Sequence, residues 1–108
     1  MSVPPRFDEL IHAPTRLSIV SLLAATEWAE FSFLRDQVGL SDSALSKQLT
    51  ILDEAGYVGI RKGFVGKRPR TSVRLSARGR RAFAGHVGAL QEIVARSGLA
   101  VVPDEVMP

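Results

Sequence analysis

The hydrophobic period of this chain changes from helical spacing to strand alternation after Gly56, and that change limits the possible folds more than any other feature. Before it, apolar residues recur at helical spacing, and two short helices are separated by only three residues, Gly39-Leu40-Ser41. We expect Ser32 and Ser41 to cap these helices, and Gly39 and Gly56 to close them in the left-handed conformation. This spacing predicts a helix-turn-helix.

The next segment carries the alternating pattern of β-strands. Val58 and Ile60 form one apolar pair at period two, and Val73 and Leu75 form another, so we expect two antiparallel strands. The connection around residues 63–70 is longer than the two to five residues that a hairpin needs, and such a surplus is often functional. A helix-turn-helix followed by a long-looped hairpin predicts a winged helix, which is mostly α with a small β-hairpin.

Two helices are expected before this unit. Phe7, Leu10 and Ile11 lie at helical spacing in a short opening helix at about 6–12. A second helix follows over 14–25 with a wide apolar face. Both are expected to contribute to the core.

A long helix is expected at the other end, over about 77–97, with Ser76 as its cap. It carries a narrow apolar seam with spacings of four, three and four residues, as in coiled coils: Phe83, Val87, Leu90 and Val94. We expect one domain over 1–97. The remaining tail, 98–108, either docks through its valines or is disordered; these are Val101, Val102 and Val106.

The basic residues are concentrated in one part of the chain. Residues 55–91 hold nine of the fourteen Lys and Arg and no Asp or Glu, whereas residues 1–54 hold four basic and eight acidic residues. A cluster of this kind favours an anionic partner. We expect the loop at 63–71 to lie on a DNA backbone or in the minor groove. Its candidate contacts surround Pro69 and are Lys67, Arg68, Arg70 and Thr71.

Three more arginines, Arg78, Arg80 and Arg81, fall in the first turns of the last helix, where the helix dipole disfavours cations. Either acidic groups of the same chain or phosphates of a ligand would compensate them. Both interpretations stay open at the level of sequence.

The second helix of the pair, over 41–55, has two distinct faces. Leu45, Leu49 and Leu52 share one face, and hydrogen-bond donors occupy the opposite face: Ser43, Ser46, Lys47 and Thr50. Such side chains can bind base edges or phosphates in a major groove, which admits an α-helix. The helix starts at Ser32 and Ser41 are weaker candidates for phosphate contacts through backbone amides.

The run from His12 to Ala24 and the run from Phe33 to Phe83 resemble the compact MarR/ArsR-like winged-helix transcriptional regulators of bacteria. The resemblance covers about residues 8–94. It implies that the helix over 41–55 reads the major groove and that the hairpin loop is the wing. Many relatives have a histidine at the position of Gln48, so their base preference does not transfer.

The resemblance also implies a homodimer formed by the first and last helices. The expected interface residues are Phe7, Leu10, Ile11, Phe83, Val87, Leu90 and Val94. A small-molecule effector could bind at such an interface, around Phe7, Leu10, Trp28 and Phe83, although apolar residues there belong more often to the core.

Several classes of protein are disfavoured. There is no cysteine, the two histidines lie in separate helices, and no Gly-rich phosphate loop occurs, so we expect neither an enzyme nor a metal site nor a cofactor. No apolar run approaches the roughly 18 residues of a membrane span, and the first residues lack a signal-peptide pattern, so we expect a cytoplasmic protein.

Two alternatives to a sequence-specific regulator stay open. The basic loop could dock an acidic protein partner, which would make the chain a protein-interaction module. The chain could also bind double-stranded DNA without sequence preference, as architectural proteins do.

Overall fold

The computed structural model describes residues 3–99 and contains five helices and three strands in that range. Their order is α1 (Glu9–His12), α2 (Pro14–Ala24), β1 (Ala29–Glu30), α3 (Phe31–Val38), α4 (Asp42–Glu54), β2 (Val58–Val65), β3 (Arg68–Leu75) and α5 (Ala77–Arg96). The predicted mostly α winged helix is confirmed. No helix in the described range is long and apolar enough to cross a membrane. The valines of the C-terminal tail lie outside the described residues.

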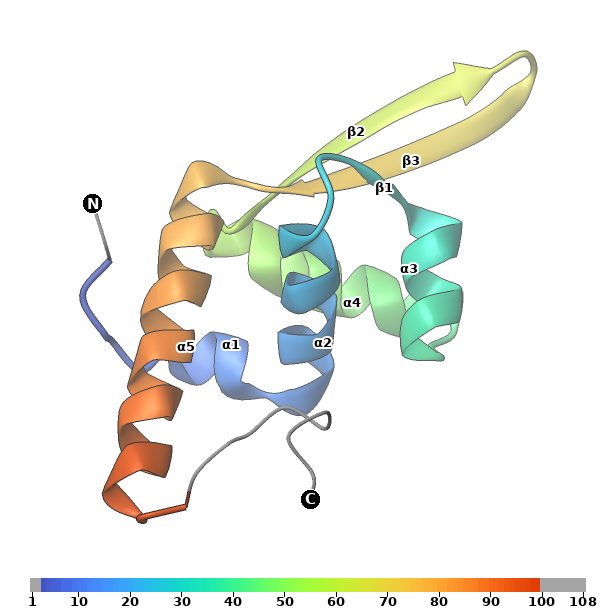
Figure 1. Cartoon of the computed structure of the whole chain (residues 1–108). Coiled ribbons are helices and arrows are strands. Elements are labelled where there is room, and N and C mark those ends of the chain that lie inside the picture. The colour runs from blue at the N-terminus through green and yellow to red at the C-terminus, as the bar shows by residue number, and fades with distance from the viewer. Residues whose placement is uncertain (1–2, 100–108) are drawn as a thin grey trace, which may run out of the picture.

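The core forms where α2 meets the sheet and the helix-turn-helix. Figure 1 shows α2 between α5 on one side and α3 on the other, with α4 crossing behind α2 and the hairpin passing over the helices. Branched apolar side chains fill this space; among them are Ile19, Val20, Leu23, Leu34, Leu45, Leu52, Val73 and Leu75, all fully buried. Their burial fixes how α4 is presented to solvent.

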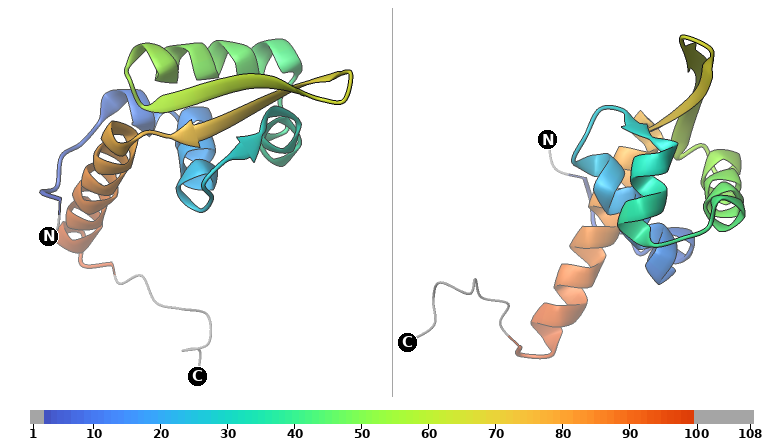
Figure 2. Two further views of the ribbon diagram at one scale, coloured as in Figure 1. Left: turned by 90° about the horizontal axis from the view of Figure 1, so that it is seen from above. Right: turned by 90° about the vertical axis from the view of Figure 1, so that its right-hand side faces the viewer.

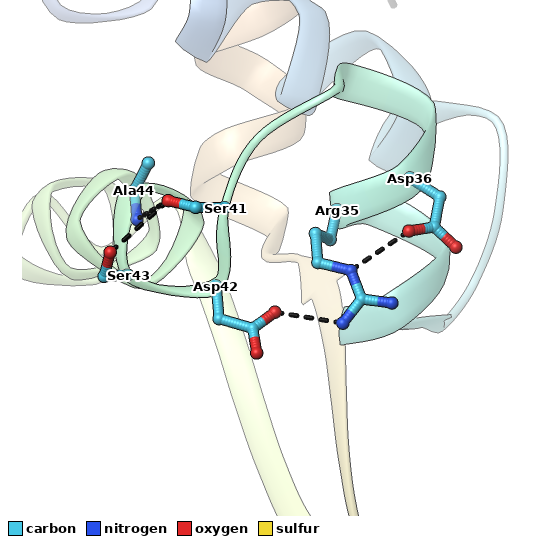
Figure 3. A network of polar contacts seen from close by, with 6 residues as sticks. All are labelled: Arg35, Asp36, Ser41, Asp42, Ser43 and Ala44. Atoms are coloured by element: carbon cyan, nitrogen blue, oxygen red, sulfur yellow. Dashed lines mark hydrogen bonds and ion pairs between the residues drawn. The ribbon is translucent and has the colours of Figure 1, made fainter.

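The helix-turn-helix has the predicted Ser41 cap at the start of α4 and the predicted left-handed Gly39 at the end of α3. The Ser41 side chain accepts a hydrogen bond from the Ala44 amide at 3.1 Å, and Gly39 ends α3 with a φ of 69°. Figure 3 shows Arg35 of α3 between two carboxylates, with its Nε 3.0 Å from Asp36 Oδ1 and its Nη1 3.0 Å from Asp42 Oδ1. The bond to Asp42 connects the two helices across the turn.

The predicted cap at Ser32 is wrong. Helix α3 begins at Phe31, with Glu30 as its N-cap in an extended conformation and no side-chain cap. The reason is β1, a strand of two residues that runs directly into α3. A strand this short has no period that a sequence could display, and its pairing with β3 (Ala29 with Val73, Glu30 with Ser72) determines where the helix starts.

The predicted long hairpin loop is also wrong. Strands β2 and β3 pair without interruption from Val58 and Leu75 out to Val65 and Arg68, so the turn is only Gly66 and Lys67. We call the part of this hairpin over residues 61–72 the wing. It projects beyond the helices, as both views in Figure 2 show. Its outer part is exposed on both faces and therefore carries no apolar alternation.

The N-terminal segment differs from the prediction in one respect. Helix α1 begins at Glu9 behind an Asp8 cap, so Phe7 precedes the helix. The residues before it are extended and lie along α5, where the Arg6 amide donates to the Gly85 carbonyl at 2.8 Å. At the other end, the predicted bounds and cap of α5 are confirmed, because Ser76 accepts from the Gly79 amide at 2.9 Å.

Candidate nucleic-acid interface

Helix α4 presents four polar side chains on its exposed face: Ser43, Ser46, Lys47 and Thr50. The opposite face, with Leu45, Leu49 and Leu52, is buried. Arg16 of α2 holds the helix from the side, because its Nη1 donates to Gln48 Oε1 at 3.0 Å and its Nε donates to the Leu10 carbonyl at 2.7 Å. These contacts fix the orientation of α4 relative to α2, and therefore the direction in which its polar face points.

A groove runs between α4 and the wing. It is lined by Phe31, Asp42, Ser46, Leu49, Thr50, Ile60, Lys62 and Thr71. The structure thus brings Ser46 and Thr50 of α4 together with Thr71 of β3, as three of the predicted contacts. The groove also includes Lys62, which was not predicted. Lys62 is two residues after Ile60 in the same strand, so the two side chains lie on the same face, and this spacing could have identified it.

The wing has two chemically different faces. Successive residues of a strand alternate between faces, so Lys62, Thr71 and the cross-strand pair Phe64 and Pro69 lie on the side of α4. Four arginines lie on the other side: Arg61, Arg68, Arg70 and Arg74. The basic cluster of the sequence is therefore divided between two surfaces, and only one of them is shared with α4.

Two of the predicted wing contacts have different surroundings. Arg70 is paired with Glu30 of β1, with its Nε 2.9 Å from Glu30 Oε1 and both side chains about half exposed. Lys67 lies in the turn at the tip and is exposed. A ligand must compete with Glu30 for Arg70, whereas no acidic side chain is paired with Lys67 among the described residues.

Trp28 lies on the arginine side of the sheet. The Arg61 guanidinium is 4.0 Å from the centre of its ring, and the Arg74 guanidinium is 5.4 Å from it. These are cation–π contacts. The groove beside Phe7 and Leu10 in a single protomer includes neither Trp28 nor Phe83; it is lined by residues such as Tyr57, Arg78 and Arg81.

The arginines at the start of α5 have separate roles. Arg80 donates from Nη1 to the Ala24 carbonyl at 3.3 Å and from Nη2 to the Thr26 carbonyl at 3.2 Å. It thus caps the C-terminal end of α2, where carbonyls are free and cations are favoured. Arg78 and Arg81 line a groove together with the acidic residues Asp8 and Glu9.

The two histidines meet, although they lie in separate helices. His12 Nδ1 is 3.3 Å from His86 Nε2, and the Asp8 amide donates to His86 Nδ1 at 3.0 Å. The Phe7 ring packs on both imidazoles, with centroid distances of 4.7 and 4.8 Å. Burial and the neighbouring His12 lower the pKa of His86, which favours the neutral form of its ring. Residues 3–99 contain no group of three or more side chains that could hold a metal ion.

The predicted interface residues on α5 are partly buried: Phe83, Val87, Leu90 and Val94. Phe7 keeps 38% of its surface exposed, but Ile11 is completely buried within its own chain and offers no surface to a partner. Sequence reasoning also missed Ile93, which is 46% exposed near the end of α5.

Comparison with known proteins gives consistent matches. A family model described as a winged helix DNA-binding domain matches residues 15–94. A structure of a transcriptional regulator homologue from Pyrococcus horikoshii OT3 has a TM-score of 0.79 and 24% identity, covering 85% of this chain and 91% of that one. A MarR family transcriptional regulator from Silicibacter pomeroyi has a TM-score of 0.67 and 22% identity, covering 91% and 64%.

A curated relative is similar over most of its length. It is an uncharacterized protein of Methanocaldococcus jannaschii, 29% identical over 79 residues, which are 73% of this chain and 86% of that protein.

Proposed function

Because the chain belongs to the winged helix DNA-binding domain family, with the fold of MarR family regulators, we propose that it is a sequence-specific transcriptional regulator. The observation that carries this proposal is the groove in which polar side chains of α4 face Lys62 and Thr71 of the wing. Ser46, Lys62 and Thr71 can donate hydrogen bonds to an acceptor-rich surface such as DNA, and the Asp42 carboxylate at the edge of the groove is paired with Arg35.

In the proposed complex, α4 enters the major groove and the wing reaches the adjacent backbone or minor groove. Ser43, Ser46, Lys47 and Thr50 would contact bases and phosphates. Thr50 already donates its hydroxyl to the Ser46 carbonyl at 3.0 Å, so it can offer DNA its lone pairs and its methyl group. Lys62, Lys67 and Arg68 would supply phosphate contacts, which position the protein without reading sequence.

The amide at the start of α4 is a poor phosphate site. The Ser41 side chain occupies the Ala44 amide, and Asp42 places a carboxylate beside it. Arg35 compensates that carboxylate within the chain. We therefore assign the phosphate contacts of this region to Lys47 and the wing rather than to the helix starts at Ser41 or Ser32.

We also propose that the protein binds DNA as a homodimer through the N-terminal segment and α5. The exposed Phe7 and Ile93 and the seam of Phe83, Val87, Leu90 and Val94 support this proposal. Two-fold symmetry predicts an approximately palindromic binding site with half-sites about one DNA turn apart. Light scattering at tens of micromolar is expected to give twice the mass of 11.7 kDa; a monomer at that concentration would contradict the dimer.

Sequencing the genomic fragments that the purified protein retains tests the main proposal. A regulator is expected to enrich a small set of fragments with a shared motif, and an architectural protein to enrich none. A protein-interaction module would retain no DNA even at low salt.

Substitutions at the two parts of the interface are expected to have different effects. Arg68→Ala should weaken binding to operator and to random DNA alike, and should reduce the salt dependence, whose slope is about −7 if each protomer neutralises about four phosphates. Ser46→Ala and Lys47→Ala should in addition reduce the ratio of operator to random affinity. Fluorescence anisotropy at several salt concentrations measures both quantities; equal losses on both DNAs for all three variants would argue against base reading by α4.

A further inference from the structure

The most exposed large apolar side chain in residues 3–99 lies at the end of the wing. Phe64 keeps 74% of its surface in contact with water, and the neighbouring Val65 keeps 55%. A phenylalanine gains from leaving water, and its own protomer leaves most of this side chain uncovered. Its position therefore calls for a partner outside the protomer.

The surroundings of Phe64 restrict the chemistry of that partner. Phe64 lies two residues before Gly66 and opposite Pro69; Lys67 lies in the turn itself, and Arg68 follows directly after it. Residues 55–91 contain no carboxylate. A purely apolar protein surface would desolvate these cations without compensation, and a second wing tip would bring like charges together. The complementary surface is a polyanion that also has apolar planes.

DNA has both features, and the orientation of Phe64 favours it. The ring lies on the face of the wing that also carries Ile60, Lys62 and Thr71, which line the groove beside α4. The same duplex that receives α4 can therefore meet Phe64 further along its axis, where the projecting wing ends (Figure 2). Apolar side chains that reach a base step from the minor groove partly unstack it and bend the duplex.

We propose that Phe64 is an apolar wedge, which enters the minor groove beside each half-site, partly unstacks one base step and bends the DNA. The inference rests on the proposed DNA-binding function and adds a specific role for one residue. The two-residue turn and Pro69 limit the freedom of the tip before binding, which reduces the entropic cost of insertion. Flexible pyrimidine–purine steps at the contacted positions are expected, because they are the easiest to unstack.

The test uses the full chain and the genomic fragment that it retains most tightly, labelled at its ends for energy transfer and carrying 2-aminopurine at the flanking adenines. Wild-type protein is expected to bend the fragment by about 20° or more and to raise the 2-aminopurine fluorescence. Phe64→Ala should abolish both signals and weaken binding roughly tenfold, while the operator preference set by α4 remains.

Two matched variants complete the design. Val65→Ala removes the adjacent exposed apolar side chain from the opposite face of the wing and should leave the bend unchanged. Phe64→Leu keeps an apolar wedge and should retain most of the bend. Because these positions are exposed, none of the variants should alter thermal stability.

Two results would overturn the inference and leave the proposed function intact. One is specific binding by the wild type without bending, and the other is an unchanged bend in Phe64→Ala. If the unchanged bend in Phe64→Ala is accompanied by a loss of self-association, the ring is assigned to a protein contact. If no fragment is retained at all, the proposed function itself fails.

Discussion

Gly79→Ala is expected to destabilise the protein by at least about 3 kcal/mol, the upper end of the usual cost of overpacking. A Cβ at this position would collide with the backbone carbonyl oxygen of Tyr57 and would lie 2.8 Å from Leu75 Cδ1. The carbonyl cannot move aside easily, because it also accepts a hydrogen bond from the Ser76 amide at 2.9 Å. The first turn of α5 packs this closely on the chain that leads from α4 into β2.

Gly88→Ala in the same helix is the matched control. A Cβ at Gly88 would meet Pro5 at 3.4 to 3.5 Å, which is ordinary van der Waals contact. Alanine is favoured over glycine inside a helix by about 1 kcal/mol, so this variant should be neutral or slightly more stable than wild type.

Thermal unfolding followed by circular dichroism measures both glycine variants. For a chain of about 100 residues, 3 kcal/mol corresponds to a decrease of about 12 °C or more in melting temperature. Equal melting temperatures for Gly79→Ala and Gly88→Ala would show that α5 can shift relative to Tyr57, contrary to the packing described above.

The second large effect expected is a loss of stability in acid that depends on His86. Burial, and then the neighbouring His12, lower the pKa of His86 below its ordinary value of 6.5, whereas the Asp8 carboxylate opposes this shift more weakly. A protonated His86 could no longer accept the hydrogen bond of the Asp8 amide, and it would face His12 across 3.3 Å. The folded protein therefore excludes a proton that the unfolded chain binds.

The direction of the pH dependence follows from this difference. At pH values well above 6.5, His86 is neutral in both the folded and the unfolded protein, and its contribution to stability is fully present. As the pH falls below 6.5, the unfolded chain takes up the proton first, so the free energy of unfolding decreases until the folded pKa is passed. The contacts that weaken join α1 and the Phe7 segment to α5, which are the elements of the proposed dimer interface.

Denaturant unfolding at pH values from 7.5 to about 5 measures this dependence. His86→Phe leaves the Asp8 amide without its acceptor and should lower stability at every pH, but it should remove this part of the slope. His12→Gln should reduce the slope without abolishing it, because burial still opposes the charge. A slope in His86→Phe equal to that of wild type would assign the acid sensitivity to other groups.

Much of the DNA-binding element could be predicted because its information is local. The Ser41 cap, the left-handed Gly39 and the buried leucine stripe of α4 each depend on residues within a few positions of one another. A helix has a fixed period, so knowledge of its buried side identifies the exposed one. The same reasoning correctly placed α5 and its Ser76 cap.

The wing shows where local reasoning stops. Its basic residues were evident, but the strands continue where the apolar pattern has ended, because hydrogen bonds between β2 and β3 form whether or not a face is buried. Only the strand register shows that Lys62 and Phe64 lie on the face of the wing that is turned toward α4. Similarly, the pairing of Arg70 with Glu30 depends on β1, a strand of two residues.

The sequence by itself determined the winged-helix class, the polar face of α4 and the concentration of positive charge in residues 55–91, since periodicity, caps and charge are properties of short segments. Only the tertiary structure decided how that charge is used. Strand register divides the wing into two faces, and Arg80 donates hydrogen bonds to carbonyls at the end of α2. The approach of α1 to α5 brings together His12 and His86, which are 74 positions apart in the chain. Such contacts are set by the packing of whole elements, and no local pattern records them.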